Sequence, residues 1–139
     1  ANVPVGLGVD GSASNNAGSL VAEARQAMLM ARVRGGADTM SPREALRIAT
    51  RGGAEVLGRN DCGVLEQGRR ADVAIWDMHT LEAAGNWDPG ALLLAGPTRV
   101  KHLFVEGRKI VVDGHLVTAD VTAIAAKARD CALRLANGD

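Results

Sequence analysis

The feature that most restricts the fold is a short apolar run near the start of the chain, residues 3–9, which ends at Asp10. Continuous apolar runs of this length are typical of strands buried on both faces, as in a parallel sheet. Residues 11–18 are small or turn-forming, and this composition favours a loop. We therefore predict a buried strand that carries a carboxylate to the point where a loop begins.

Two helices are expected after this loop. Apolar residues recur at helical spacing over residues 19–34. A second helix is predicted to begin at Ser41, which can cap it while the Glu44 side chain bonds back to the Ser41 backbone, and to run to Leu57. The glycine pair at 52–53 lies inside this helix, where the missing side chains would let a neighbouring segment approach closely.

The second half of the chain is predicted to be β-rich. Strands are expected at residues 73–76, 100–105, 110–112 and 116–117, with turns at 106–107 and 113–114. Alanine and isoleucine then recur at helical spacing over residues 121–136, which predicts a terminal surface helix. The chain is thus an α/β chain with three expected parts, residues 1–60, 61–118 and 119–139.

Composition excludes several classes of partner. The 139 residues contain 16 Lys and Arg against 16 Asp and Glu, so no net positive charge is available to hold nucleic acid or an anionic membrane. Aromatic residues are only 2%, too few for a surface on which bases stack. We expect no nucleic-acid and no membrane partner. The two cysteines lack metal-type or redox-type spacing, which makes the cytoplasm the expected location.

Three motifs, in order along the chain, together resemble the C-terminal third of the metal-dependent amidohydrolases. They are Gly-Val-Asp-Gly-Ser-Ala-Ser-Asn at 8–15, the helix start Ser-Pro-Arg-Glu-Ala-Leu at 41–46 followed by Ala-Thr at 49–50, and the segment 63–72. Residues 105–111 also resemble a hairpin of that family. The likeness is greatest to the branch of 8-oxoguanine, guanine and triazine aminohydrolases.

The resemblance implies a fold. In this family the catalytic domain is a (β/α)8 barrel, and a small β-domain lies beside it. Residues 3–9 would then be the eighth barrel strand, residues 1–60 this strand with its helices, and residues 61–118 part of the β-domain. Barrel enzymes keep their chemistry at the C-terminal tips of the strands, which is where Asp10 would lie.

The resemblance also implies an activity, the hydrolytic deamination of a purine-like or triazine-like ring at a C–N bond. Asp10 would lie beside one divalent metal per site, Zn²⁺ or Fe²⁺, as an outer ligand. It would accept a proton from the attacking water and return it to the departing amine. Ser12, Ser14 and Asn15 would line the pocket of a small heterocyclic substrate.

The metal ligands that the family uses are histidines on other barrel strands, and this chain lacks them. It has only His79, His102 and His115, all in the β-rich part and without ligand spacing. One carboxylate cannot hold a catalytic zinc, which commonly has three protein ligands. We expect the isolated chain to be an inactive segment, completed by a missing N-terminal part of the enzyme or by another copy in a homo-oligomer.

Three other interpretations stay open. Asp10 can be a turn residue with a purely structural role, and the whole chain can be a non-catalytic structural or interaction remnant. A phosphate-binding loop at Gly6-x-Gly8-x-x-Gly11 fits the glycine pattern. This last interpretation is weaker, because Asp10 within the loop would repel a phosphate.

Overall fold

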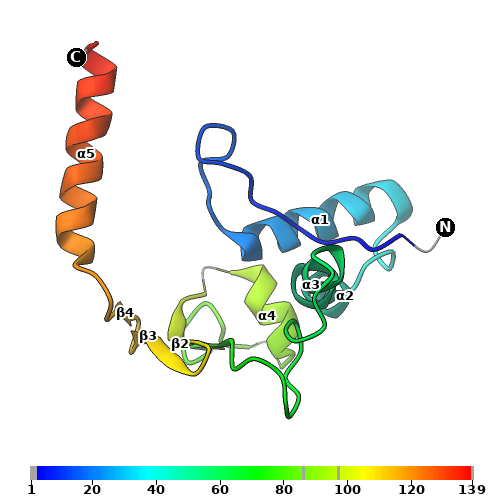
Figure 1. Cartoon of the computed structure of the whole chain (residues 1–139). Helices are drawn as coiled ribbons and strands as arrows, with labels where there is room; N and C mark the ends of the chain where they lie inside the picture. The colour runs from blue at the N-terminus through cyan, green and yellow to red at the C-terminus, as the bar shows by residue number, and fades with distance from the viewer. Residues whose placement is uncertain (1–2, 86, 97, 139) are drawn as a thin grey trace.

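The computed structural model describes residues 3–85, 87–96 and 98–138, and Figure 1 shows their arrangement. The helical segments are α1 (Leu20–Gly35), α2 (Pro42–Arg47), the π-helical turn η1 (Ile48–Gly52), α3 (Gly53–Val56), α4 (Pro89–Ala95) and α5 (Val121–Asn137). The strands are β1 (Val73–Trp76), β2 (Val100–Val105), β3 (Arg108–Val112) and β4 (His115–Leu116). None of the helices in the described ranges combines the length and the apolar character that a membrane span requires.

The helices begin at the residues whose side chains cap them. The Ser19 hydroxyl accepts the Ala22 N–H at 3.3 Å at the start of α1. At α2 the predicted capping box is present: Ser41 Oγ accepts the Glu44 N–H at 3.3 Å, and Glu44 Oε2 accepts the Ser41 N–H at 2.7 Å. The segments α2, η1 and α3 follow one another directly, so the helix expected over 41–57 is confirmed, with a π-helical turn in its middle.

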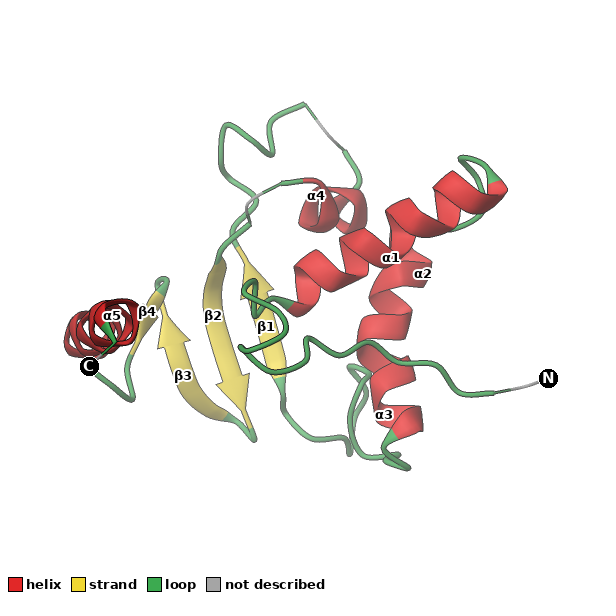
Figure 2. Cartoon of the chain, turned by 90° about the horizontal axis from the view of Figure 1, so that it is seen from above, coloured by secondary structure: helices red, strands yellow, loops and turns green. Residues whose placement is uncertain are grey.

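The four strands form one antiparallel sheet in the order β1-β2-β3-β4, drawn in yellow in Figure 2. Both predicted turns are present, and the two residues of each have positive φ: 49° and 75° at Glu106 and Gly107, 48° and 78° at Asp113 and Gly114. Two-residue turns of this kind match the right-handed twist of the strands that they join. The predicted strands in the β-rich half are confirmed.

The apolar core lies among α1, α2 and α4. Its buried members are Ala24, Met28, Ala45 and Leu94, and Leu7, Val21, Met40, Leu46 and Ala49 pack against them. The sequence interpretation did not include α4, which comes from residues 61–118 yet packs against the helices of residues 1–60. The core therefore joins the first two expected parts of the chain.

The strand predicted over residues 3–9 is not formed, and this is the main correction to the expected fold. A β-strand requires hydrogen bonds to a neighbouring strand, and β1 to β4 pair only with one another in the described ranges. Residues 3–9 instead run as an extended segment across the helix at Gly52 and Gly53. The apolar pattern is present, but the described chain offers this segment no sheet.

The terminal helix α5 is confirmed as a surface helix. Asp120 caps its start by accepting the Ala123 N–H at 3.0 Å, and Gly138 in a left-handed conformation ends it. None of its residues is buried. In Figure 1 it leaves the sheet beyond β4 and points away from the other helices.

Candidate functional site

Asp10 lies where the extended segment turns into the loop before α1. Its backbone is left-handed, with φ of 61°, a conformation that Asp tolerates better than most residues. Its Oδ1 accepts the Gly11 N–H at 2.7 Å, and the residue is exposed. The carboxylate is therefore held at a defined turn and remains accessible to a reactant.

The position of this turn depends on the contact between the extended segment 3–9 and the helical segments η1 and α3. A Cβ on Gly52 would overlap the Val5 carbonyl oxygen, and a Cβ on Gly6 would lie 2.8 Å from Gly53 Cα. Backbone therefore lies directly against backbone, which confirms the close approach that the glycine pair predicts. Leu7 packs on the core beside this contact. The segment that ends in Asp10 is thus anchored three residues before the carboxylate.

The other predicted site residues lie on the loop that follows Asp10. The Gly11 carbonyl accepts the N–H groups of Ser14 and Asn15 at 2.9 and 3.0 Å, which closes a tight turn. Ser12 and Ser14 are exposed on this turn, whereas Asn15 is half-buried. One exposed loop therefore presents a carboxylate and two hydroxyls.

Glu23, in the first turn of α1, is a residue of this region that the sequence interpretation missed. Asn15 Nδ2 donates to Glu23 Oε1 at 2.7 Å, and Asn15 Oδ1 accepts the Ala17 N–H at 2.9 Å. Both polar atoms of the Asn15 side chain are therefore engaged within the chain. An acidic residue in a first helical turn is common for helix-dipole reasons alone, so the sequence signal for this contact is weak.

The described residues do not by themselves fit a metal site. No group of three or more His, Cys, Asp or Glu gathers there in a way that could hold an ion. His102 and His115 lie on strands, and both contact the turn at Asp113: its N–H donates to His102 Nδ1 at 3.3 Å, and its carbonyl lies 2.8 Å from His115 Nδ1. Asp10 could thus supply one carboxylate to a centre whose other ligands come from elsewhere.

The phosphate-loop interpretation is also not supported. After the glycine pattern at 6–11 the chain continues as the loop described above, and α1 begins only at Leu20. A phosphate-binding loop needs a helix N-terminus directly after it, because the free N–H groups of the first turn bind the anion.

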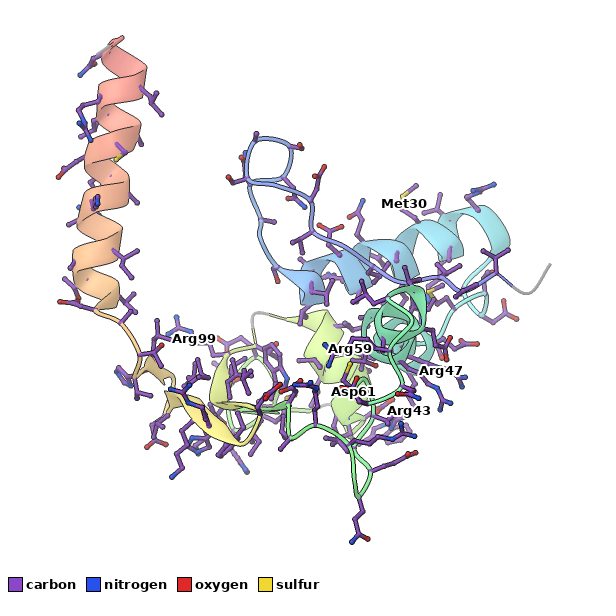
Figure 3. All side chains as sticks on the ribbon, viewed as in Figure 1. Met30, Arg43, Arg47, Arg59, Asp61 and Arg99 are labelled. Carbon is purple, nitrogen blue, oxygen red and sulfur yellow. The ribbon has the colours of Figure 1, made fainter. Side chains whose placement is uncertain are left out.

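Segment 59–72 has a structural role that the sequence interpretation missed. Both oxygens of Asp61 accept from Arg59, each at 2.9 Å, and Oδ2 also accepts Arg70 Nε at 2.6 Å (Figure 3 labels Arg59 and Asp61). These hydrogen bonds hold the pKa of the Asp61 carboxyl well below its usual range. Arg70 also pairs with Glu106, whose N–H donates to Asp72 Oδ1 at 2.8 Å.

This network connects the end of the helical segment to the hairpin between β2 and β3. The Gly107 N–H adds a backbone bond to the Ala71 carbonyl at 3.0 Å. The motif at 63–72 and the hairpin at 105–111 are therefore parts of one structural joint. Its charged residues are paired with one another near the surface.

Three features follow one another along the chain: an extended segment that ends in Asp10, a capped helix and a small antiparallel sheet. The chain matches the amidohydrolase family over residues 1–117, and it belongs to that family. The resemblance seen in the motifs is thereby confirmed.

Two relatives of the chain are deaminases. The chain is 45% identical to 8-oxoguanine deaminase of Pseudomonas aeruginosa, in an alignment that covers 99% of this chain and 31% of the deaminase. It is 32% identical to isoxanthopterin deaminase from an unidentified prokaryote, covering 93% of this chain and 30% of that protein. The chain spans about a third of the length of these relatives.

Solved structures show the same fold. Atrazine chlorohydrolase of Arthrobacter aurescens, in complex with zinc, is 40% identical with a TM-score of 0.84, covering 92% of this chain and 29% of the hydrolase. An adenosine deaminase of Xanthomonas campestris with bound zinc is 31% identical with a TM-score of 0.88. The match covers 97% of this chain and 32% of that deaminase. The described fold is therefore a part of the amidohydrolase fold, and its sheet fits a small additional domain.

Proposed function

We propose that this chain is the part of a metal-dependent aminohydrolase that carries its acid–base carboxylate, Asp10. The reaction is the hydrolytic deamination of a purine-like or triazine-like ring. Water adds to a ring carbon, the C–N bond to the amino group breaks, and ammonia leaves. The observation that carries this proposal is the exposed Asp10, held at a left-handed turn by a segment that packs against the helix. The deaminase relatives support the reaction class, and atrazine chlorohydrolase supports a hydrolase that acts on a triazine-type ring.

Asp10 is suited to moving a proton between the two reactants. A carboxylate can take a proton from the attacking water and give it to the leaving amine, which makes ammonia a better leaving group. The hydrogen bond from the Gly11 N–H occupies Oδ1 and leaves Oδ2 available for this transfer. We propose Ser12 and Ser14 as contacts of the small heterocyclic substrate. Asn15 shares the loop, but its amide is already bonded within the chain.

The metal of the complete enzyme is proposed to be Zn²⁺ or Fe²⁺, one per site, with Asp10 as an outer ligand. Zinc in the two solved relatives supports a divalent cation. The described residues other than Asp10 do not fit such a centre, so the remaining ligands come from outside this chain. A missing N-terminal part, or another copy in a homo-oligomer, would supply them.

The extended segment 3–9 is proposed to become the eighth strand of a (β/α)8 barrel when its neighbouring strands are present. Its nearly continuous apolar sequence suits a strand that is buried on both faces. We place the enzyme in the cytoplasm, because Cys62 and Cys131 are both free thiols, the form that a reducing compartment maintains.

The experiment that tests the proposal is Asp10→Asn in the complete enzyme that carries this chain. We expect turnover of an oxidised purine or a triazine to fall by about 10²- to 10⁴-fold, the range that general acid–base catalysis supplies, with unchanged folding. Asp130→Asn on α5 removes the same charge and should leave turnover intact. Near-normal turnover of the Asp10 variant would contradict the acid–base role.

Intact mass and metal content of the natural protein test the wider proposal. A larger polypeptide, or a complementary chain with the missing histidines and one metal per site, supports an aminohydrolase. A metal-free chain of only these 139 residues would favour the alternative of a non-catalytic module.

A further inference from the structure

We infer that Glu23 is a positioning residue for Asp10, and that it acts by holding the catalytic loop on α1 through Asn15. The inference rests on the proposed function, because it assigns Glu23 to the loop that presents the acid–base carboxylate. It also gives Asn15 a holding role in place of direct contact with the substrate.

A path of hydrogen bonds connects Glu23 to Asp10. Glu23 Oε1 accepts Asn15 Nδ2 at 2.7 Å, a short bond between half-buried residues. The Asn15 N–H donates to the Gly11 carbonyl at 3.0 Å, and the Gly11 N–H donates to Asp10 Oδ1 at 2.7 Å. A displacement of Asn15 would therefore be passed to the peptide that follows Asp10.

The helix that carries Glu23, α1, is packed into the core. Its neighbour Ala24 is completely buried, and Met28 one turn later is buried in the same core. Ser19 caps the helix just before this turn. Residues 11–14 and 16–18 are exposed, and among the described residues the Asn15–Glu23 bond is the side-chain hydrogen bond between this loop and α1.

The contact between Asn15 and Glu23 is more specific than the general effect of a carboxylate in a first helical turn. A first-turn carboxylate stabilises a helix whatever it touches, since it interacts with the helix dipole. Here the Asn15 amide is oriented at both ends, with Nδ2 on Glu23 and Oδ1 on the Ala17 N–H. The contact needs a donor at residue 15 and an acceptor at residue 23. Mutation of both residues can exchange these two roles.

The test uses three variants of the complete enzyme. Asn15→Asp places two carboxylates against each other, and we expect kcat/KM to fall by about 10- to 100-fold, as for other residues that orient a catalytic group. Asn15→Asp combined with Glu23→Gln restores one donor and one acceptor with reversed direction, and should recover activity to within a few-fold of the parent. Asn137→Asp on α5 adds the same charge at an exposed residue far along the chain from this loop and should leave activity unchanged.

Amide hydrogen exchange at residues 11–17 provides a second measurement that does not depend on turnover. Exchange should accelerate in Asn15→Asp and return toward the parent rate in the double variant. A single variant with parental activity and exchange, or a double variant no better than the single one, would overturn the inference. If Asp10→Asn keeps its turnover, the proposed function fails on that result, while the exchange rates still decide whether Glu23 holds the loop.

Discussion

At the scale of single residues, two adjacent glycines show how differently the same residue type can be used. Gly52 is buried against the Val5 carbonyl, whereas nothing lies within 4 Å of a Cβ built on Gly53. Both have right-handed helical backbone angles, so neither needs glycine for its conformation. Only the first is required for packing.

We predict that Gly52→Ala destabilises the chain by roughly 1–3 kcal/mol, the usual cost of forcing extra volume into a packed contact. Gly53→Ala should be neutral or stabilising by up to about 1 kcal/mol, because alanine is the better helix former. Urea unfolding of the two variants checks both effects. Equal stabilities would show that the extended segment does not lie against Gly52 in solution.

In the complete enzyme the same pair of variants should differ in activity. Gly52→Ala would displace the segment that ends in Asp10, and a shift of about 1 Å in a catalytic group can cost about 10²-fold in rate. Gly53→Ala should retain parental kcat. Loss of activity in both variants to the same degree would mean that the helix itself, rather than this contact, is sensitive to substitution.

At the scale of secondary structure, the helix starts and the hairpins were predictable because their signals are local. A capping serine, a proline at the first position and a glutamate at the third lie within four residues at 41–44. The two hairpin turns likewise depend on residue pairs at 106–107 and 113–114. Helix α4 was missed because its short apolar run, Ala91–Ala95, has no helical repeat of its own.

The capping box predicts how stability depends on pH. Hydrogen bonds from the Ser41 backbone and hydroxyl lower the pKa of the Glu44 carboxyl. A lowered folded-state pKa means that the stabilisation is fully present above the ordinary carboxyl pKa and is lost as pH falls through the lowered value. The parent should therefore have a larger free energy of unfolding than Glu44→Gln near neutral pH, and this difference should vanish in acid.

Chemical unfolding of both proteins at several pH values measures this difference. Glutamine keeps an acceptor oxygen in the box but does not titrate, so it isolates the effect of charge. A difference in unfolding free energy that stays constant from neutral to acid pH would contradict the capping role of the Glu44 carboxylate. Ser41→Ala removes the cap itself and should cost about 1 kcal/mol near neutral pH. Its cost should be smaller in acid, because the Ser41 hydroxyl also donates to the Glu44 carboxylate.

At the scale of the whole molecule, the packed core is small for the length of the chain. Leu94 is the only large side chain with less than 2% exposure among the described residues, and α5 buries none of its residues. Leu20, Leu29, Met30 and Val33 of α1 are also exposed. Such a chain gains little stability from its own apolar contacts.

Added Zn²⁺ should leave the melting temperature of the 139-residue chain unchanged. An ion bound to the folded state would raise it by mass action, and the described residues gather no set of three donors. Differential scanning fluorimetry with and without Zn²⁺, and with a chelator as control, checks this. Tight binding of one equivalent by the monomer would contradict the proposal that the other ligands come from elsewhere.

The sequence by itself determined the features that arise within a few neighbouring residues: the cap at Ser41, the two hairpin turns, the helical stripes and the family motifs. The tertiary structure alone decided the path of residues 3–9, the packing of α4, the joint at Asp61 and the bond between Asn15 and Glu23. The physical reason is the range of the interactions. Caps and turns are satisfied inside one short segment, whereas a strand, a core or an ion network exists only when distant segments supply its partners.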